Sequence, residues 1–90
     1  MAESEYVAEC FWPGVGEDDL SALDERVAGV VAALNERGEP VRYLGSMLMR
    51  GDDVVLCLFQ GPEPAVRIAA TQAGIPFERI LEAVRSPRSS

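Results

Sequence analysis

Five polar side chains in the sequence are of types that could bind a ligand or move a proton. They are Glu9, Arg42, Ser46, Gln60 and Glu82. Two carboxylates on neighbouring strands, such as Glu9 and Glu82, would supply the oxygen ligands that suit a hard divalent cation. A single carboxylate among apolar neighbours could instead act as a general base in a small isomerase or cyclase. The polar side chains could equally pair with one another, with Arg42 bound to a carboxylate.

The sequence contains no histidine, which excludes imidazole acid–base catalysis, histidine-dependent triads and histidine metal ligands. The two cysteines, Cys10 and Cys57, lack the spacing of a metal site. We expect both to be buried as apolar residues, because free cysteine is among the most buried residue types and a disulfide is improbable in a reducing compartment.

These side chains must be positioned by a central hairpin over 41–59. Two apolar runs of strand composition, 41–49 and 54–59, flank the sequence Arg50-Gly51-Asp52-Asp53, which suits a tight turn. The second run is apolar at every position, so both of its faces must be covered. This places it in the interior of a sheet.

The remaining elements surround the hairpin. Alternation predicts a strand over 5–12, and a stripe at three- and four-residue spacing predicts a helix over 17–37. A shorter helix is expected at 64–73 and a last strand at 78–84. The order strand, helix, strand, strand, helix, strand is that of an α+β ferredoxin-like domain. We predict an antiparallel sheet of order 4-1-3-2 with both helices on one face.

Strand alternation predicts which side chains share a face. The five polar candidates should lie on the open side of the sheet together with Val7, Phe11, Leu44, Leu48, Leu56 and Leu58. The helices should cover Tyr6, Ala8, Cys10, Trp12, Tyr43, Met47, Cys57 and Phe59. Because so many large aliphatic side chains would stand on the open side, we expect a homodimer formed through it, with the ligand site on the same face.

Charge and length limit the classes of partner. The net charge is −7 and every positive charge is an arginine, which argues against nucleic-acid binding. No apolar run approaches the roughly 20 residues of a membrane span. The first ten residues lack a secretion signal, so we expect a cytoplasmic protein with one domain at 1–85 and a disordered tail at 86–90.

Several short motifs together resemble a known family. They are Pro13-Gly14, Arg42-Tyr43-Leu44-Gly45-Ser46, Cys57-Leu58-Phe59 followed by Pro62, Ala65-Val66-Arg67, and Ala73-Gly74 with Pro76, Arg79 and Ile80. In order and spacing the chain resembles a family of small, largely uncharacterised bacterial ferredoxin-like proteins that includes an actinobacterial nickel-responsive, nickel-binding protein. The resemblance implies a homodimeric ferredoxin-like fold and a family-level capacity to bind nickel.

The sequence departs from the family pattern in the second helix and before it. Family members often carry a histidine in that helix, two residues after an acidic residue, and Ile68 and Ala70 hold those places here. Gln60-Gly61 replaces a usual Glu-Ala. A nickel site that uses the helix imidazole is therefore not expected, and no metal ligand is transferred from the family.

Three classes of function remain open. The first is a small binding protein of the nickel-responsive family that holds nickel, another divalent metal or a small molecule on a dimeric sheet face. The second is a cofactor-free enzyme of the isomerase or cyclase type on the same face. The third is a protein whose only role is association.

Overall fold

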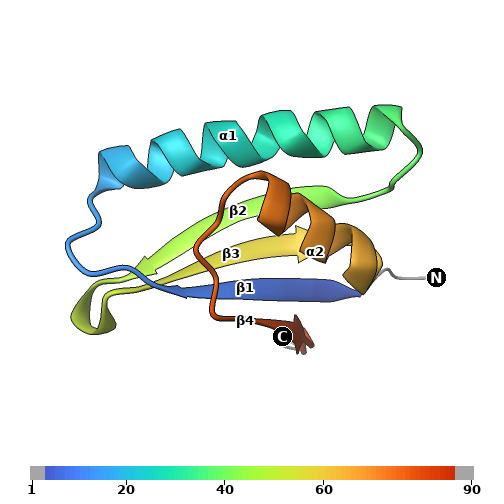
Figure 1. Cartoon of the computed structure of the whole chain (residues 1–90). Coiled ribbons are helices and arrows are strands. Elements are labelled where there is room, and N and C mark those ends of the chain that lie inside the picture. Colours follow the sequence, from blue (N-terminus) through green and yellow to red (C-terminus); the bar gives the residue numbers. More distant parts are fainter. Residues whose placement is uncertain (1–3, 87–90) are drawn as a thin grey trace.

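The computed structural model describes residues 4–86 of the chain. Strands and helices follow in the order β1, α1, β2, β3, α2, β4 (Figure 1). Their bounds are Glu5–Phe11 for β1, Glu17–Glu36 for α1, Arg42–Met49 for β2, Val54–Gln60 for β3, Glu63–Gln72 for α2 and Arg79–Ala83 for β4. The predicted order is confirmed, and every predicted boundary lies within one residue of the observed one.

The four strands form one antiparallel sheet in the order β2-β3-β1-β4. This is the predicted order 4-1-3-2 read from the opposite edge. β3 and β1 are central, as the unbroken apolar run of β3 requires. The turn between β2 and β3 is a short 3₁₀ segment, Arg50–Asp52, followed by Asp53 in the left-handed conformation with φ of 54°.

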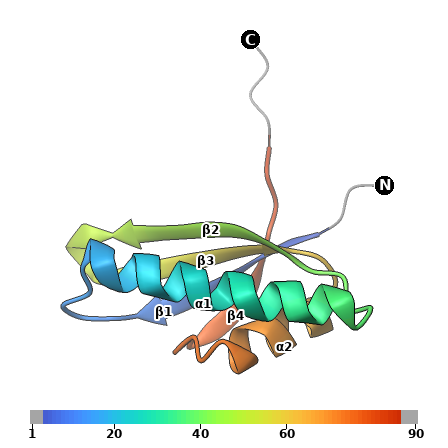
Figure 2. The same ribbon diagram turned by 90° about the horizontal axis from the view of Figure 1, so that it is seen from above.

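Both helices lie on the same side of the sheet, which leaves the other side without cover from the described residues (Figures 1 and 2). The predicted stripe of α1 is buried at four positions, and Leu20 and Val30 pack at its margin. The buried side chains of α2 are small except for Val66. The two helices and the covered sheet face enclose the core, whose largest fully buried side chains include Phe59, Leu23 and Leu34.

A β-bulge in β2 changes the predicted facing of three residues. The register to β3 shifts between Tyr43 and Gly45, and Gly45 has φ of +112°. Leu44 is therefore an extra residue, and every side chain after it changes side. The predictions for Ser46, Met47 and Leu48 were wrong: Ser46 and Leu48 face the helices, and Met47 lies on the open side.

The prediction for Glu82 was also wrong. In the register of β1 with β4, Glu82 stands opposite Tyr6, and Ile80 stands opposite Ala8. Directly opposed residues share a face, and Ala8 and Ile80 belong to the core, so Glu82 lies on the helix side. The odd-numbered residues of β4 point to the open side instead.

No helix within residues 4–86 has the length and apolar character needed to cross a membrane. The tail predicted for 86–90 lies outside the described residues except for Ser86. The division into a domain at 1–85 and a tail therefore stays a prediction.

Candidate functional site

The sheet side away from the helices, called the open face below, carries side chains from all four strands. The strand register arranges them in rows across the sheet. From one end to the other the rows are Arg42, Gln60, Glu5 and Ala83; Gly45, Leu58, Val7 and Leu81; Met47, Leu56, Glu9 and Arg79; and Met49, Val54 and Phe11. None of these residues is buried within the single chain.

Much of the open face is apolar and exposed. Phe11 is 56% exposed, Met47 49% and Leu81 41%. Their neighbours Leu56 and Leu58 are half-buried. A contiguous apolar surface of this kind marks an interaction or ligand-binding site on a soluble protein.

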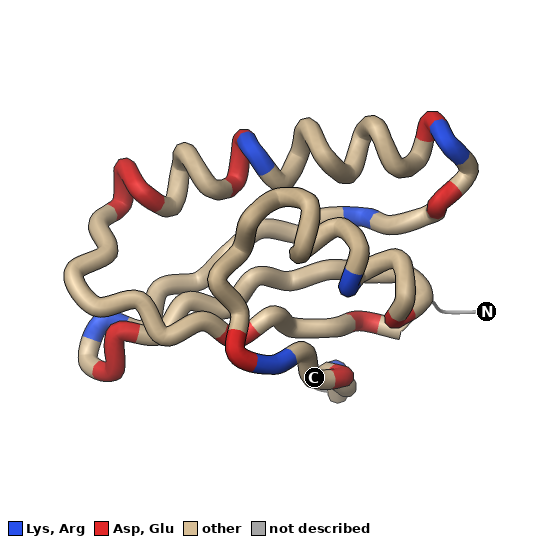
Figure 3. The backbone as a smooth tube through the Cα atoms, viewed as in Figure 1, with Lys and Arg blue, Asp and Glu red and all other residues tan. Residues whose placement is uncertain are grey.

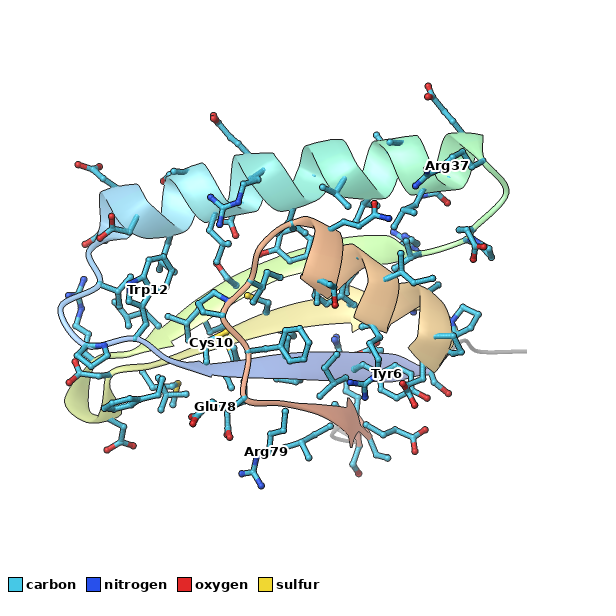
Figure 4. The ribbon with its side chains drawn as sticks, viewed as in Figure 1. Tyr6, Cys10, Trp12, Arg37, Glu78 and Arg79 are labelled. Atoms are coloured by element: carbon cyan, nitrogen blue, oxygen red, sulfur yellow. The ribbon has the colours of Figure 1, made fainter. Side chains whose placement is uncertain are left out.

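An ion pair lies within this apolar surface. Arg79 Nε is 2.7 Å from Glu9 Oε1, and the two residues stand directly opposite each other on β4 and β1. The hydrogen bond to Glu9 raises the pKa of the Arg79 guanidinium. Figure 4 shows the Arg79 side chain directed away from the helices. The carboxylate that the sequence places on a central strand is therefore paired, which is one of the ways in which such a group is tolerated there.

A row of polar side chains crosses one end of the open face. Arg42 Nη1 donates to Gln60 Oε1 at 3.2 Å, and Arg85 Nη2 donates to Glu5 Oε1 at 2.9 Å. Gln60 and Glu5 are opposite each other on neighbouring strands. We call these four side chains, Arg42, Gln60, Glu5 and Arg85, the polar row.

The structure brings three of the five sequence-predicted site residues together on the open face: Glu9, Arg42 and Gln60. Ser46 and Glu82 lie on the other side of the sheet. Sequence reasoning missed Glu5, Arg79 and Arg85, which pair with or adjoin the predicted residues. Alternation along β1 places Glu5 with Glu9, but Arg79 depends on the register of β4, for which the sequence carries no signal.

A second polar cluster lies on the helix side. The Asp24 carboxylate of α1 accepts hydrogen bonds from Tyr43 Oη and, at 2.8 Å, from Ser46 Oγ. Burial and the hydrogen bond to Asp24 raise the pKa of the Tyr43 phenol. These bonds tie α1 to β2, and all three residues are partly buried. No buried side-chain nitrogen or oxygen atom within residues 4–86 lacks a hydrogen-bond partner, so the cluster leaves no buried polar atom for a ligand to satisfy.

Both cysteines are free and fully buried, as predicted. The contact with the Cys10 thiol and burial raise the pKa of the Cys57 thiol, so Cys57 stays protonated at neutral pH. Figure 4 places Cys10 in the interior of the fold and Trp12 between the sheet and α1. A buried, protonated thiol is a poor nucleophile and a poor metal ligand.

The described residues of one chain do not form a nickel site. Among residues 4–86, no three His, Cys, Asp or Glu side chains lie close enough together to hold a metal ion. Glu9 already accepts a hydrogen bond from Arg79, and Glu82 is on the other face. The predicted pairing of Glu9 and Glu82 on one cation is therefore impossible within a single chain.

A shallow hollow of about 450 Å³ lies on the outer surface of α2. Its lining is Pro64, Arg67, Ile68, Thr71 and Gln72, all from this one helix. Ile68, which is 37% exposed, is its large apolar side chain. Because one helix alone lines it and it is open to solvent, the hollow is a weaker ligand site than the open face.

Comparison with known proteins agrees with this architecture. The chain is similar to SCO4226 from Streptomyces coelicolor A3(2), whose crystal structure superposes with a TM-score of 0.72 at 21% sequence identity. The match covers 92% of this chain and 99% of the other, and at this identity it establishes the shared fold. A search of curated proteins gave no match. The profile of the family described as "Nickel responsive protein SCO4226-like" matches residues 6–83. This chain therefore belongs to the SCO4226-like family of nickel-responsive proteins.

Proposed function

We propose that this chain is a small cytoplasmic binding protein that works as a homodimer. The open face is the surface through which two copies associate, and the ligand, a small molecule or a metal ion, lies on that face. The observation that carries the proposal is an exposed apolar surface with an ion pair inside it, on the side of the sheet that the helices leave uncovered. Two free, buried cysteines suit a reducing compartment such as the cytoplasm.

The exposed apolar side chains of the open face support association. Full burial of a large apolar side chain contributes about 1.5 to 3 kcal/mol. Phe11, Met47, Met49 and Leu81 are each more than 40% exposed, and Leu56 and Leu58 are half-buried. Each of these side chains is already about half-covered, so covering the rest of all six on both copies of a dimer would contribute on the order of 10 kcal/mol before the cost of association. This is enough to hold a twofold dimer.

The distribution of charge also favours this face. α1 carries six acidic side chains and one arginine, and Figure 3 shows the acidic positions along it. The open face and its margin carry Glu5 and Glu9 against Arg42, Arg79 and Arg85, a balance of +1. Two copies with a net charge of −7 each therefore meet with less repulsion through the open face than through α1.

The same face suits a small molecule better than a metal ion within one chain. It offers apolar walls with a few polar groups, whereas a metal needs three or more donors that the described residues of one chain do not bring together. Nickel binding, which the family name suggests, would require ligands from both copies. Glu9, which lies nearer the middle of the face than Glu5, is the carboxylate with which two copies would share a cation.

Sedimentation at micromolar concentration tests the homodimer. We expect the wild type to be dimeric and Leu56→Glu to be a folded monomer, because the charge would be trapped at the centre of the interface. Ile68→Glu is the matched control: it puts the same charge on a large aliphatic residue of α2, on the helix side, and should stay dimeric. A monomeric wild type, or a Leu56→Glu variant that remains dimeric, contradicts the proposal.

Calorimetric titration with nickel, cobalt, copper and zinc tests the metal alternative. If a metal binds on the open face, Glu9→Gln should abolish the heat of binding and Glu82→Gln, on the opposite side of the sheet, should leave it unchanged. Absence of any binding tighter than about 1 mM, near 4 kcal/mol, excludes a metal as the ligand. Equal losses in both variants would show that the metal does not lie on the open face.

A further inference from the structure

One end of the open face carries a positive charge that the described residues do not neutralise. Of the three arginines on and beside the open face, Arg79 is paired with Glu9 and Arg85 with Glu5. Among residues 4–86, no carboxylate lies within 4.0 Å of the Arg42 guanidinium. The polar row therefore holds two guanidinium groups against one carboxylate, a balance of one positive charge. In a protein of net charge −7 this is a local exception.

The unpaired charge is accompanied by a second hydrogen-bond donor. Gln60 uses its carbonyl oxygen to accept from Arg42 Nη1, so its amide NH₂ group is left to donate. The remaining N–H groups of Arg42 are donors as well. Arg42 and Gln60 therefore offer donors and one positive charge, since the Glu5 carboxylate of the same row is paired with Arg85. Such a pair of side chains selects an acceptor with one negative charge, and a planar carboxylate matches the guanidinium fork.

The neighbouring row is apolar and has a gap in it. Gly45, beside Arg42 on β2, has no side chain, and a Cβ at this position would meet nothing within 4 Å. Leu58, Val7 and Leu81 continue the row across the other three strands. An aliphatic chain could therefore lie over this row with its head group at Arg42.

We propose that the polar row is the head-group site for an amphipathic monocarboxylate. Its carboxylate pairs with Arg42 and Gln60, and its apolar body lies on the row from Gly45 to Leu81, between the two copies of the dimer. This inference names the class of ligand for the face described above, and it rests on the proposed function.

Calorimetry with decanoate as the probe tests this site on the full chain. We expect wild-type protein to bind decanoate with a Kd below 1 mM, and decylamine and 1-decanol at least about tenfold more weakly, a difference of at least about 1.4 kcal/mol. Arg42→Gln should weaken decanoate binding by the same factor. Arg50→Gln removes the same charge from an exposed arginine in the turn after β2 and should change the Kd by less than about twofold.

Amide NMR spectra and sedimentation of the ligand-free proteins make each outcome decisive. Amide NMR spectra confirm that each variant is folded, and decanoate should shift the signals of Gly45, Leu58 and Gln60 and leave those of α2 unchanged. A dimeric wild type that does not bind decanoate, equal weakening by Arg42→Gln and Arg50→Gln, or shifts confined to α2 would overturn the site and leave the homodimer standing. If Arg42→Gln loosens the ligand-free dimer, Arg42 pairs with a carboxylate of the second copy and the inference is wrong. A monomeric wild type would instead overturn the proposed function.

Discussion

Between Val54 and Phe59, the central strand β3 is apolar on both faces of the sheet, but the two faces lie in different environments. In β3, Val55, Cys57 and Phe59 are fully buried against the helices, while the alternate residues Leu56 and Leu58 are only half-buried on the open face. Hydrophobicity does not distinguish the two sets. The difference is in what covers them, because two helices on one side can shield only that side. The open face is thus a second apolar surface that one chain does not cover.

Two phenylalanines provide the sharpest test of this comparison. Phe59→Ala removes a ring from the covered face, where it packs on Tyr43 with ring centroids 5.1 Å apart, and should cost about 3 to 5 kcal/mol of unfolding free energy. Phe11 lies on the open face and is 56% exposed. Phe11→Ala should therefore cost about 1 kcal/mol or less of unfolding free energy in a monomer. Urea unfolding in the Leu56→Glu background measures both without a contribution from association.

For the affinity of the dimer, Phe11→Ala should have the larger effect of the two variants. Phe11→Ala, made in the otherwise wild-type chain, should weaken the dimer, because a half-exposed ring on the open face becomes buried in the interface. Similar losses of folding stability for the two alanine variants would mean that the two faces are covered alike within one chain. The distinction between them would then be wrong.

Most of the fold could be predicted from the sequence because its signals are local. The run from Val54 to Phe59 requires a central strand, and the stripe on α1 requires a helix with one buried side. The assignment of Cys10, Cys57 and Phe59 to the core followed from alternation in strands without irregularity. The same alternation placed Glu9 correctly on the open face.

The errors arise where alternation is interrupted or where register is free. In β2, apolar residues occur on both faces, so the sequence pattern does not show that Leu44 is an extra residue. In β4, either the odd-numbered or the even-numbered residues could face the helices. Only the observed register with β1 puts Arg79 beside Glu9. Both errors concern single-residue shifts, which reverse the face of every residue that follows.

The bulge itself can be tested at Gly45. Its φ of +112° is strained for any residue with a Cβ, although a Cβ there would have open space around it. Gly45→Ala should therefore cost about 1 to 3 kcal/mol through backbone strain alone. Gly29 is solvent-exposed and lies in the middle of α1, so Gly29→Ala should stabilise the protein by about 0.5 to 1 kcal/mol. Thermal unfolding of the two variants should give shifts of opposite sign, and a neutral Gly45→Ala would contradict the bulge.

A loss at the lower end of the range for Gly45→Ala is expected at the Asp24 cluster, which the bulge creates by directing Ser46 to the helix side. Tyr43→Phe and Ser46→Ala each remove one hydrogen bond to Asp24 and should each cost about 1 kcal/mol at neutral pH. Only Tyr43→Phe also removes a titrating group, the phenol. The pH dependence of stability above pH 10 therefore distinguishes two otherwise similar losses.

The sign of that dependence follows from the raised pKa of Tyr43. Because the folded protein holds the phenol proton more tightly than the unfolded chain, whose ordinary pKa is 10.0, the contribution of Tyr43 is fully present below pH 10 and is lost as the pH rises further. Urea unfolding at pH 9, 10 and 11 should show wild type and Ser46→Ala losing stability along parallel lines and Tyr43→Phe losing less. Parallel lines for all three proteins would mean that the Tyr43 phenol is not held by Asp24, and the covered face would then lack the bond that ties α1 to β2.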